Sequence, residues 1–143
     1  MIRSLGLNAI RVRENTNPFA FHYRFHSDVT KIQKKRIIFL GTPSVSAKSL
    51  QILYDSTKND DCIYEIIGVV SQPPARAGKK MKLTSSPVHI LAQELNIPNI
   101  MTPLSAKDET FLNNLSNLKP DLFITAAYGQ FLPNFFLNIS KYV

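Results

Sequence analysis

Four cations lie within seven residues of one another and are suited to binding an anion: Arg76, Lys79, Lys80 and Lys82. A basic cluster on a loop favours a polyanion such as an RNA backbone, because phosphate neutralisation supplies most of the affinity of such contacts. A solvated loop without any partner has the same composition. The pattern alone therefore leaves RNA binding and simple solvation open.

A second candidate segment follows the last apolar run of the chain. It places a glycine among aromatic and apolar residues, in the order Tyr128, Gly129, Gln130, Phe131, Leu132 and Pro133. At the end of a buried strand, such residues are able to line a pocket for a flat heterocycle. An ordinary turn with buried aromatic side chains is the equal alternative.

Other kinds of site have little support in the sequence. The turn after the first apolar run, Gly41-Thr42-Pro43-Ser44, lacks the glycine spacing of a dinucleotide-binding loop and of a P-loop. The lone Cys62 forms no internal disulfide, and no Cys/His cluster has the spacing of a zinc site. We therefore predict no metal site and assign no catalytic residue.

The elements that position these segments follow from hydrophobic periodicity. Apolar runs predict strands at residues 37–40, 64–70, 99–101 and 121–127. Capping signals predict helices that begin at Ser44, at Ser86-Pro87 and after a capping box at 105–108. Because strands alternate with helices, we expect an α/β fold, with a doubly wound, Rossmann-like parallel sheet and helices on both faces. Both candidate segments then follow strands at the carboxyl edge of that sheet.

The net charge of +7 is concentrated at the N-terminus. Residues 1–36 carry eight basic and two acidic side chains, whereas residues 37–143 carry nine and eight. Scattered arginines with few acids and no long apolar block indicate an organelle transit peptide over residues 1–33, followed by a folded domain over 34–143. A disordered basic tail without function is the alternative for residues 1–33. No apolar stretch approaches the roughly 18 residues of a membrane-spanning helix. We thus expect a mitochondrial protein, with the chloroplast as the alternative.

Several segments, taken together and in order, resemble the N-terminal domain of methionyl-tRNA formyltransferases. The matching segments are Arg36–Pro43, Gly68–Pro73, Ser86–Val88, Lys119–Asp121 and Ala127–Pro133. The resemblance extends from residue 36 to about residue 139. It implies transfer of a formyl group from 10-formyltetrahydrofolate to the methionine of initiator methionyl-tRNA, in bacteria, mitochondria and chloroplasts. We expect the complete protein to be monomeric, and the residues themselves predict neither a membrane span nor a metal site.

The resemblance assigns a role to each candidate segment. Arg76, Lys79, Lys80 and Lys82 then belong to a basic insertion that approaches the acceptor end of the tRNA. Lys79 replaces the arginine usual in the family, so a planar bidentate contact is not expected there. The segment from Tyr128 to Pro133 then forms part of the wall around the pterin ring of the folate.

The family's reacting groups are missing from these 143 residues. The resemblance implies an Asn-x-His motif, a later aspartate and a Ser-Leu-Leu-Pro segment, and none of them occurs before Val143. We therefore expect an N-terminal fragment with an incomplete sheet and no activity of its own. The alternatives are another folate-dependent enzyme, namely a glycinamide ribonucleotide formyltransferase or a formyltetrahydrofolate hydrolase, or a non-catalytic RNA-binding fragment. The basic loop favours tRNA over the other two enzymes.

Overall fold

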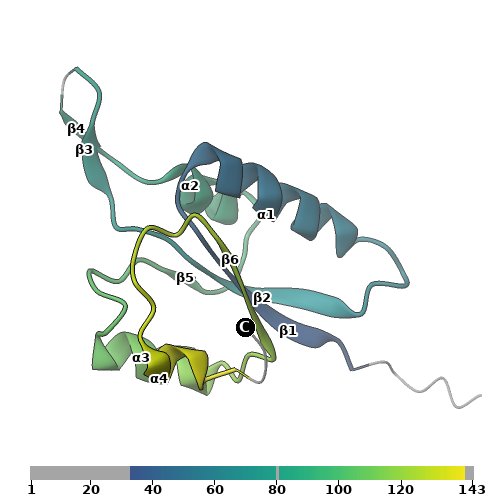
Figure 1. Ribbon diagram of the computed structural model, residues 1–143. Helices are drawn as coiled ribbons and strands as arrows, with labels where there is room; N and C mark the ends of the chain where they lie inside the picture. The colour runs from purple at the N-terminus through teal and green to yellow at the C-terminus, as the bar shows by residue number, and fades with distance from the viewer. Residues whose placement is uncertain (1–32, 80, 141–143) are drawn as a thin grey trace, which may run out of the picture. The chain divides into compact units, whose positions relative to one another are not determined.

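The computed structural model describes residues 33–79 and 81–140, which are coloured in Figure 1. The predicted transit peptide lies outside the described residues except for residue 33, and Lys80 lies outside them as well. No helix among the described residues is both long and apolar enough to cross a membrane. The described residues thus belong almost entirely to the predicted domain over 34–143.

A sheet of four parallel strands forms the centre of this domain. Its order is β5-β2-β1-β6. The strands are β1 (Lys35–Gly41), β2 (Tyr64–Val70), β5 (Ile100–Met101) and β6 (Leu122–Ala126). All four lie where apolar runs predict them, which confirms the parallel α/β sheet. The central strand β1 is buried on both faces, as its continuous apolar run indicates.

Helices cover both faces of the sheet, as predicted (Figure 1). One face carries α1 (Ser44–Ser56) and α2 (Pro87–Glu94), and the other carries α3 (Glu109–Asn117) and α4 (Asn134–Leu137). Successive side chains of β1 point to opposite faces of the sheet and so separate two cores. Phe39 packs with α1 and α2, whereas Ile38 and Leu40 pack with α3 and α4. Each helix layer is thus fixed by one side of the same strand.

Helices α1 and α3 begin where predicted, but their capping residues differ from Ser44 and from the serine of the 105–108 capping box. Pro43, not Ser44, is the N-cap of α1, and its carbonyl accepts the first helical bond from the backbone N–H of Ala47 at 3.1 Å. At α3 the cap is Asp108, whose Oδ1 accepts from the N–H of Phe111 at 2.8 Å. At α3, Ser105 and Asp108 both favour caps, so the sequence does not fix the register between them. At α1, Pro43 is the extended residue before the first turn and makes no side-chain cap bond.

The basic segment is a hairpin rather than the irregular loop expected from its composition. Strand β3 (Ala75–Ala77) pairs antiparallel with β4 (Lys82–Thr84), and Arg76 lies opposite Leu83. Gly78 has a φ of 72°, a left-handed conformation that glycine adopts without strain, and so permits the tight turn. Figure 1 shows the hairpin projecting away from the sheet.

Two serines hold the ends of this hairpin segment against the sheet. Ser71, directly after β2, and Ser86, the confirmed N-cap of α2, share a buried hydroxyl-to-hydroxyl hydrogen bond. Ser86 Oγ also accepts from the backbone N–H of His89 at 3.0 Å. The pair therefore closes the base of residues 72–85 and starts α2 at the same point.

Replacing Ser86 by alanine tests this anchor. Ser86→Ala removes the cap and the hydroxyl partner of buried Ser71, so we expect a loss of about 2 kcal/mol in the free energy of unfolding. Ser49→Ala is the control, because the Ser49 hydroxyl bonds only its own exposed helix, at Val45 O. Denaturant unfolding of the complete protein encoded by the gene measures both variants. Equal losses in the two would contradict the anchor.

Candidate functional site

The loops that follow the four parallel strands meet at the carboxyl edge of the sheet, where ligands bind in open α/β folds. Several hydrogen bonds between these loops run from a side chain to a backbone carbonyl. Thr42, after β1, donates its hydroxyl to the carbonyl of Tyr128 at 2.7 Å, and Gln72, after β2, donates to the same carbonyl at 3.3 Å. The 127–133 loop is thus hydrogen-bonded to the loops that follow the two central strands, β1 and β2.

The backbone of the 127–133 loop has an unusual conformation. Ala127 has a φ of 48° and Gly129 a φ of 88°, so two nearby residues are left-handed. For alanine this costs roughly 1–2 kcal/mol. The positive φ of Gly129 favours glycine there, and an added Cβ would also lie 3.3 Å from Gln72 Nε2, a close contact with the end of that side chain. Strain of this kind is kept only where surrounding contacts fix it, and it concentrates at functional sites.

The six residues predicted as a pterin wall point in different directions. Tyr128 is 2% exposed and packs in the core on the α3 side, and Leu132 is partly buried against the same core. Phe131 is 81% exposed, and Pro133 caps α4. The folate contact of this segment stays a prediction. If the segment binds a ring, Phe131 and the backbone are accessible to it, whereas the ring of Tyr128 supports the loop from below.

The hydroxyl of Tyr128 is buried and has no hydrogen-bond partner. Burial raises the pKa of this phenol from 10.0 to about 12. A phenol with no acceptor in an apolar surrounding stays protonated at neutral pH, so Tyr128 does not act as a base. Its polar tip is a cost to the fold and gives the site no reacting group.

The raised pKa makes the stability of the fold sensitive to alkali. The Tyr128 phenol ionises near pH 10.0 in the unfolded chain and near pH 12 in the folded one. Its contribution to the free energy of unfolding is therefore complete below pH 10 and is lost as the pH rises toward 12. We expect Tyr128→Phe to match the wild type at neutral pH and to lose less stability at about pH 11. Guanidinium unfolding at the two pH values measures this. An identical alkaline loss in both proteins would exclude the Tyr128 phenol as its source.

The hairpin presents its cations to solvent. Arg76, Lys79 and Lys82 are exposed, as are the apolar side chains of Met81 and Leu83. The ion pairs among the described residues, Arg36–Glu65 and Lys58–Asp55, lie elsewhere. The three described cations are therefore available to an external anion.

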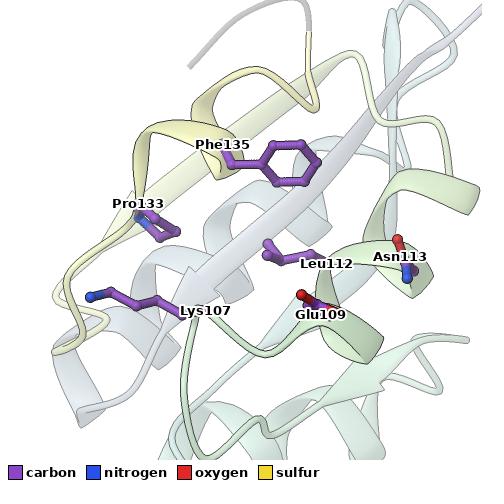
Figure 2. Close-up of a pocket in the computed structure, with 6 residues that line it drawn as sticks. All are labelled: Lys107, Glu109, Leu112, Asn113, Pro133 and Phe135. Carbon is purple, nitrogen blue, oxygen red and sulfur yellow. The ribbon is translucent and has the colours of Figure 1, made fainter.

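A cavity of about 410 Å³ lies between α3 and α4, the two helices that cover the same face of the sheet (Figure 2). Its walls come from two segments and comprise Lys107, Glu109, Leu112, Asn113, Pro133 and Phe135. Sequence reasoning missed this cavity because it depends on how the four-residue helix α4 packs on α3. Among the described residues, no group of three or more His, Cys, Asp or Glu side chains is placed to hold a metal ion.

Comparison with known families decides what kind of protein carries this geometry. Residues 35–142 match the model of the formyl transferase family. The match begins at the first residue of β1 and includes all the described elements after it. The chain belongs to the formyl transferase family. The predicted resemblance is confirmed by curated relatives named methionyl-tRNA formyltransferase. The relative from Clostridioides difficile is 41% identical over 106 residues, and that from Prochlorococcus marinus strain AS9601 is 44% identical over 108.

The match covers only part of these formyl transferases. It includes 74% of this chain and 32% of the Clostridioides difficile protein, and 75% of this chain and 31% of the Prochlorococcus marinus protein. The chain therefore spans about a third of the length of the curated relatives it matches. The regions of these relatives outside the match have no counterpart in the aligned residues.

Solved formyl transferase structures share the fold. Glycinamide ribonucleotide transformylase 1 from Symbiobacterium toebii has a TM-score of 0.54 at 17% identity, covering 76% of this chain and 48% of that one. The same enzyme from Geobacillus kaustophilus has a TM-score of 0.55 at 18% identity, covering 73% and 53%. At these identities the likeness concerns the fold alone, and it agrees with the predicted α/β sheet.

Proposed function

We propose that the complete protein transfers a formyl group from 10-formyltetrahydrofolate to the methionyl group of initiator tRNA. The observation that carries the proposal is the 41–44% identity, over 106–108 residues, to relatives named methionyl-tRNA formyltransferase. A formyl transferase family match over residues 35–142 supports the class of reaction. The described residues then supply substrate contacts.

The hairpin is the proposed tRNA contact. Its cations Arg76, Lys79 and Lys82 are exposed, and together with Lys80 they form the only basic cluster of residues 37–143. Ser71 and Ser86 fix its base, so the hairpin projects from a defined point of the sheet. A positive projection of this kind suits a phosphate backbone, and exposed Leu83 adds an apolar surface for a base or sugar.

The 127–133 loop is the proposed folate contact. It lies at the carboxyl edge of the sheet and combines exposed Phe131 with a constrained glycine backbone. A pterin is flat, with hydrogen-bonding edges, so it requires a stacking or apolar surface beside backbone donors and acceptors. The hairpin and this loop share no residue. Changes in one should therefore leave binding of the other substrate intact.

The reacting groups lie outside these residues in this proposal. Attack of an amine on a formyl carbon needs donors aimed at the developing oxyanion and a group that accepts the proton. The resemblance assigns these tasks to an Asn-x-His motif and an aspartate that do not occur in the 143 residues. We therefore propose that residues 34–143 bind and orient substrates, and that the reacting groups are supplied from outside these residues.

Complementation tests the proposed function in cells. The gene's complete product, without residues 1–33, is expressed in a bacterium whose own methionyl-tRNA formyltransferase has been deleted. We expect formylated methionyl-tRNA to reappear in extracted tRNA and growth to recover. Soluble protein with no formylated tRNA would contradict the proposal.

We also propose that residues 1–33 direct the protein to mitochondria, with chloroplasts as the alternative in a plant cell. The support is their composition, which includes four arginines and two acids. Fused to a fluorescent reporter, this segment should bring it into the organelle. Replacing the arginines Arg3, Arg11, Arg13 and Arg24 by glutamine should abolish import. A cytosolic location of the unmodified fusion would overturn this proposal.

A further inference from the structure

The side chain of Gln130 lies between the loops that follow three different strands. Its Oε1 accepts from the backbone N–H of Ala106 at 2.7 Å. Its Nε2 donates to Gln72 Oε1 at 3.1 Å and to the carbonyl of Pro103 at 3.3 Å. One side chain of the 127–133 loop is therefore bonded to the loop after β2 and to the segment that joins β5 to α3.

Gln72 extends this chain of hydrogen bonds. Its Oε1 accepts from Gln130, and its Nε2 donates to the carbonyl of Tyr128 at 3.3 Å. The hydroxyl of Thr42 donates to the same carbonyl at 2.7 Å. The two glutamines, which we call the amide clamp, thus connect the loops that follow β2, β5 and β6. Thr42 joins the loop after β1 to the same carbonyl. Each amide uses both its donor and its acceptor, which few other side chains are able to do.

The amide clamp acts on the part of the loop with the least favourable backbone. Tyr128, whose carbonyl receives two of these bonds, lies between the left-handed residues Ala127 and Gly129. Without the hydrogen bonds to the Tyr128 carbonyl, Ala127 would return to a right-handed or extended conformation. Such a change would rotate the peptide units that follow it, and those units belong to the proposed folate contact.

We propose that Gln72 and Gln130 are positioning residues that hold the 127–133 loop in the conformation that binds the formyl-folate donor. This inference rests on the proposed function and goes beyond it by naming residues that act through the loop. Gln130 acts through its side chain, which is turned to neighbouring loops. Gln72 stands outside the 127–133 loop altogether.

Alanine variants of the complete protein test the clamp. We expect Gln72→Ala and Gln130→Ala each to raise the Kd for 5-formyltetrahydrofolate, a stable isomer of the donor, about tenfold. Because the two side chains bond each other, the double variant should lose less than the product of the single effects. The Kd for initiator tRNA should stay unchanged. Gln51→Ala is the matched control, since Gln51 bonds Asp55 on the exposed side of α1.

Hydrogen exchange tests the clamp without any folate. The Ala106 amide donates to Gln130 Oε1, so Gln130→Ala should speed its exchange together with that of residues 127–132. Gln130→Glu keeps this acceptor and should preserve the protection of Ala106. It loses the amide donors, however, and places a carboxylate against the Pro103 carbonyl. Its folate affinity should therefore be low at pH 7 and recover as the pH falls toward about 4, where the acid, with an ordinary pKa of about 4.3, is protonated and donates.

The outcomes separate this inference from the proposed function. A wild-type protein that binds 5-formyltetrahydrofolate while both alanine variants bind it equally well would overturn the clamp alone. Unchanged exchange at Ala106 and residues 127–132 in Gln130→Ala would overturn it as well. A Gln130→Glu variant with no recovery at low pH would reduce the glutamine to a structural role. A wild type without any folate affinity would overturn the proposed function and the inference together.

Discussion

Alanine in place of Arg76, Lys79, Lys80 and Lys82 weakens binding of initiator tRNA by the complete protein on the order of 100-fold at about 0.1 M salt. Each cation that neutralises a phosphate releases counterions, so losing four contacts flattens the slope of log affinity against log salt by about 3. The KM for the formyl donor stays unchanged, because the 127–133 loop shares no residue with the hairpin. Filter binding at several salt concentrations, with initial rates, measures both quantities.

A charge-matched variant controls for the loss of positive charge. Lys34, Lys35, Lys48 and Lys58 are four lysines at the amino end of β1 and on or beside α1, away from the hairpin. Their replacement removes the same formal charge and should change the salt slope little. Equal slopes in the hairpin variant and the wild type would show that the hairpin cations are only solvated. Equal losses in the two quadruple variants would show attraction by net charge alone.

Phe136→Ala has the largest expected effect on stability. Phe136 is fully buried and its ring lies 4.5 Å from that of Phe123, centroid to centroid, across the core on the α3 side. Removing a buried phenyl ring leaves a cavity as well as lost apolar burial, so we expect a loss of about 4 kcal/mol in the free energy of unfolding. Denaturant unfolding of the complete protein measures this loss.

The neighbouring residue provides the control for Phe136. Phe135 on the same short helix is 61% exposed and lines the cavity between α3 and α4. Phe135→Ala should therefore cost less than about 1 kcal/mol. If the two variants lost equal stability, α4 would not be anchored as the structure describes, and the position of the 127–133 loop before it would lose its support.

The sheet could be predicted because its signals are local. The run Ile37–Leu40 is apolar on both faces, which is typical of a central parallel strand. Ser86 followed by Pro87 marks the start of α2 correctly, since both residues satisfy the first helical turn without tertiary help. The family resemblance then depended on short segments at the ends of these elements.

The remaining features depend on contacts between distant residues. The hairpin strands are three residues each, and the side chains of β4 are exposed, so hydrophobic alternation does not reveal the hairpin. The inward direction of Tyr128 follows from the left-handed backbone at Ala127, which no sequence pattern marks. The sequence does not single out Gln72, because its hydrogen-bond partner Gln130 lies 58 residues away in the chain. Only the topology of the sheet brings these loops together.

Transfer of a labelled formyl group tests the proposed function most directly. The purified complete protein is incubated with 10-formyltetrahydrofolate labelled in the formyl group and with equal concentrations of initiator methionyl-tRNA and glycinamide ribonucleotide. We expect label on the methionyl-tRNA, with release of one tetrahydrofolate for each formyl group transferred. Label on glycinamide ribonucleotide, or free labelled formate without transfer, would contradict it.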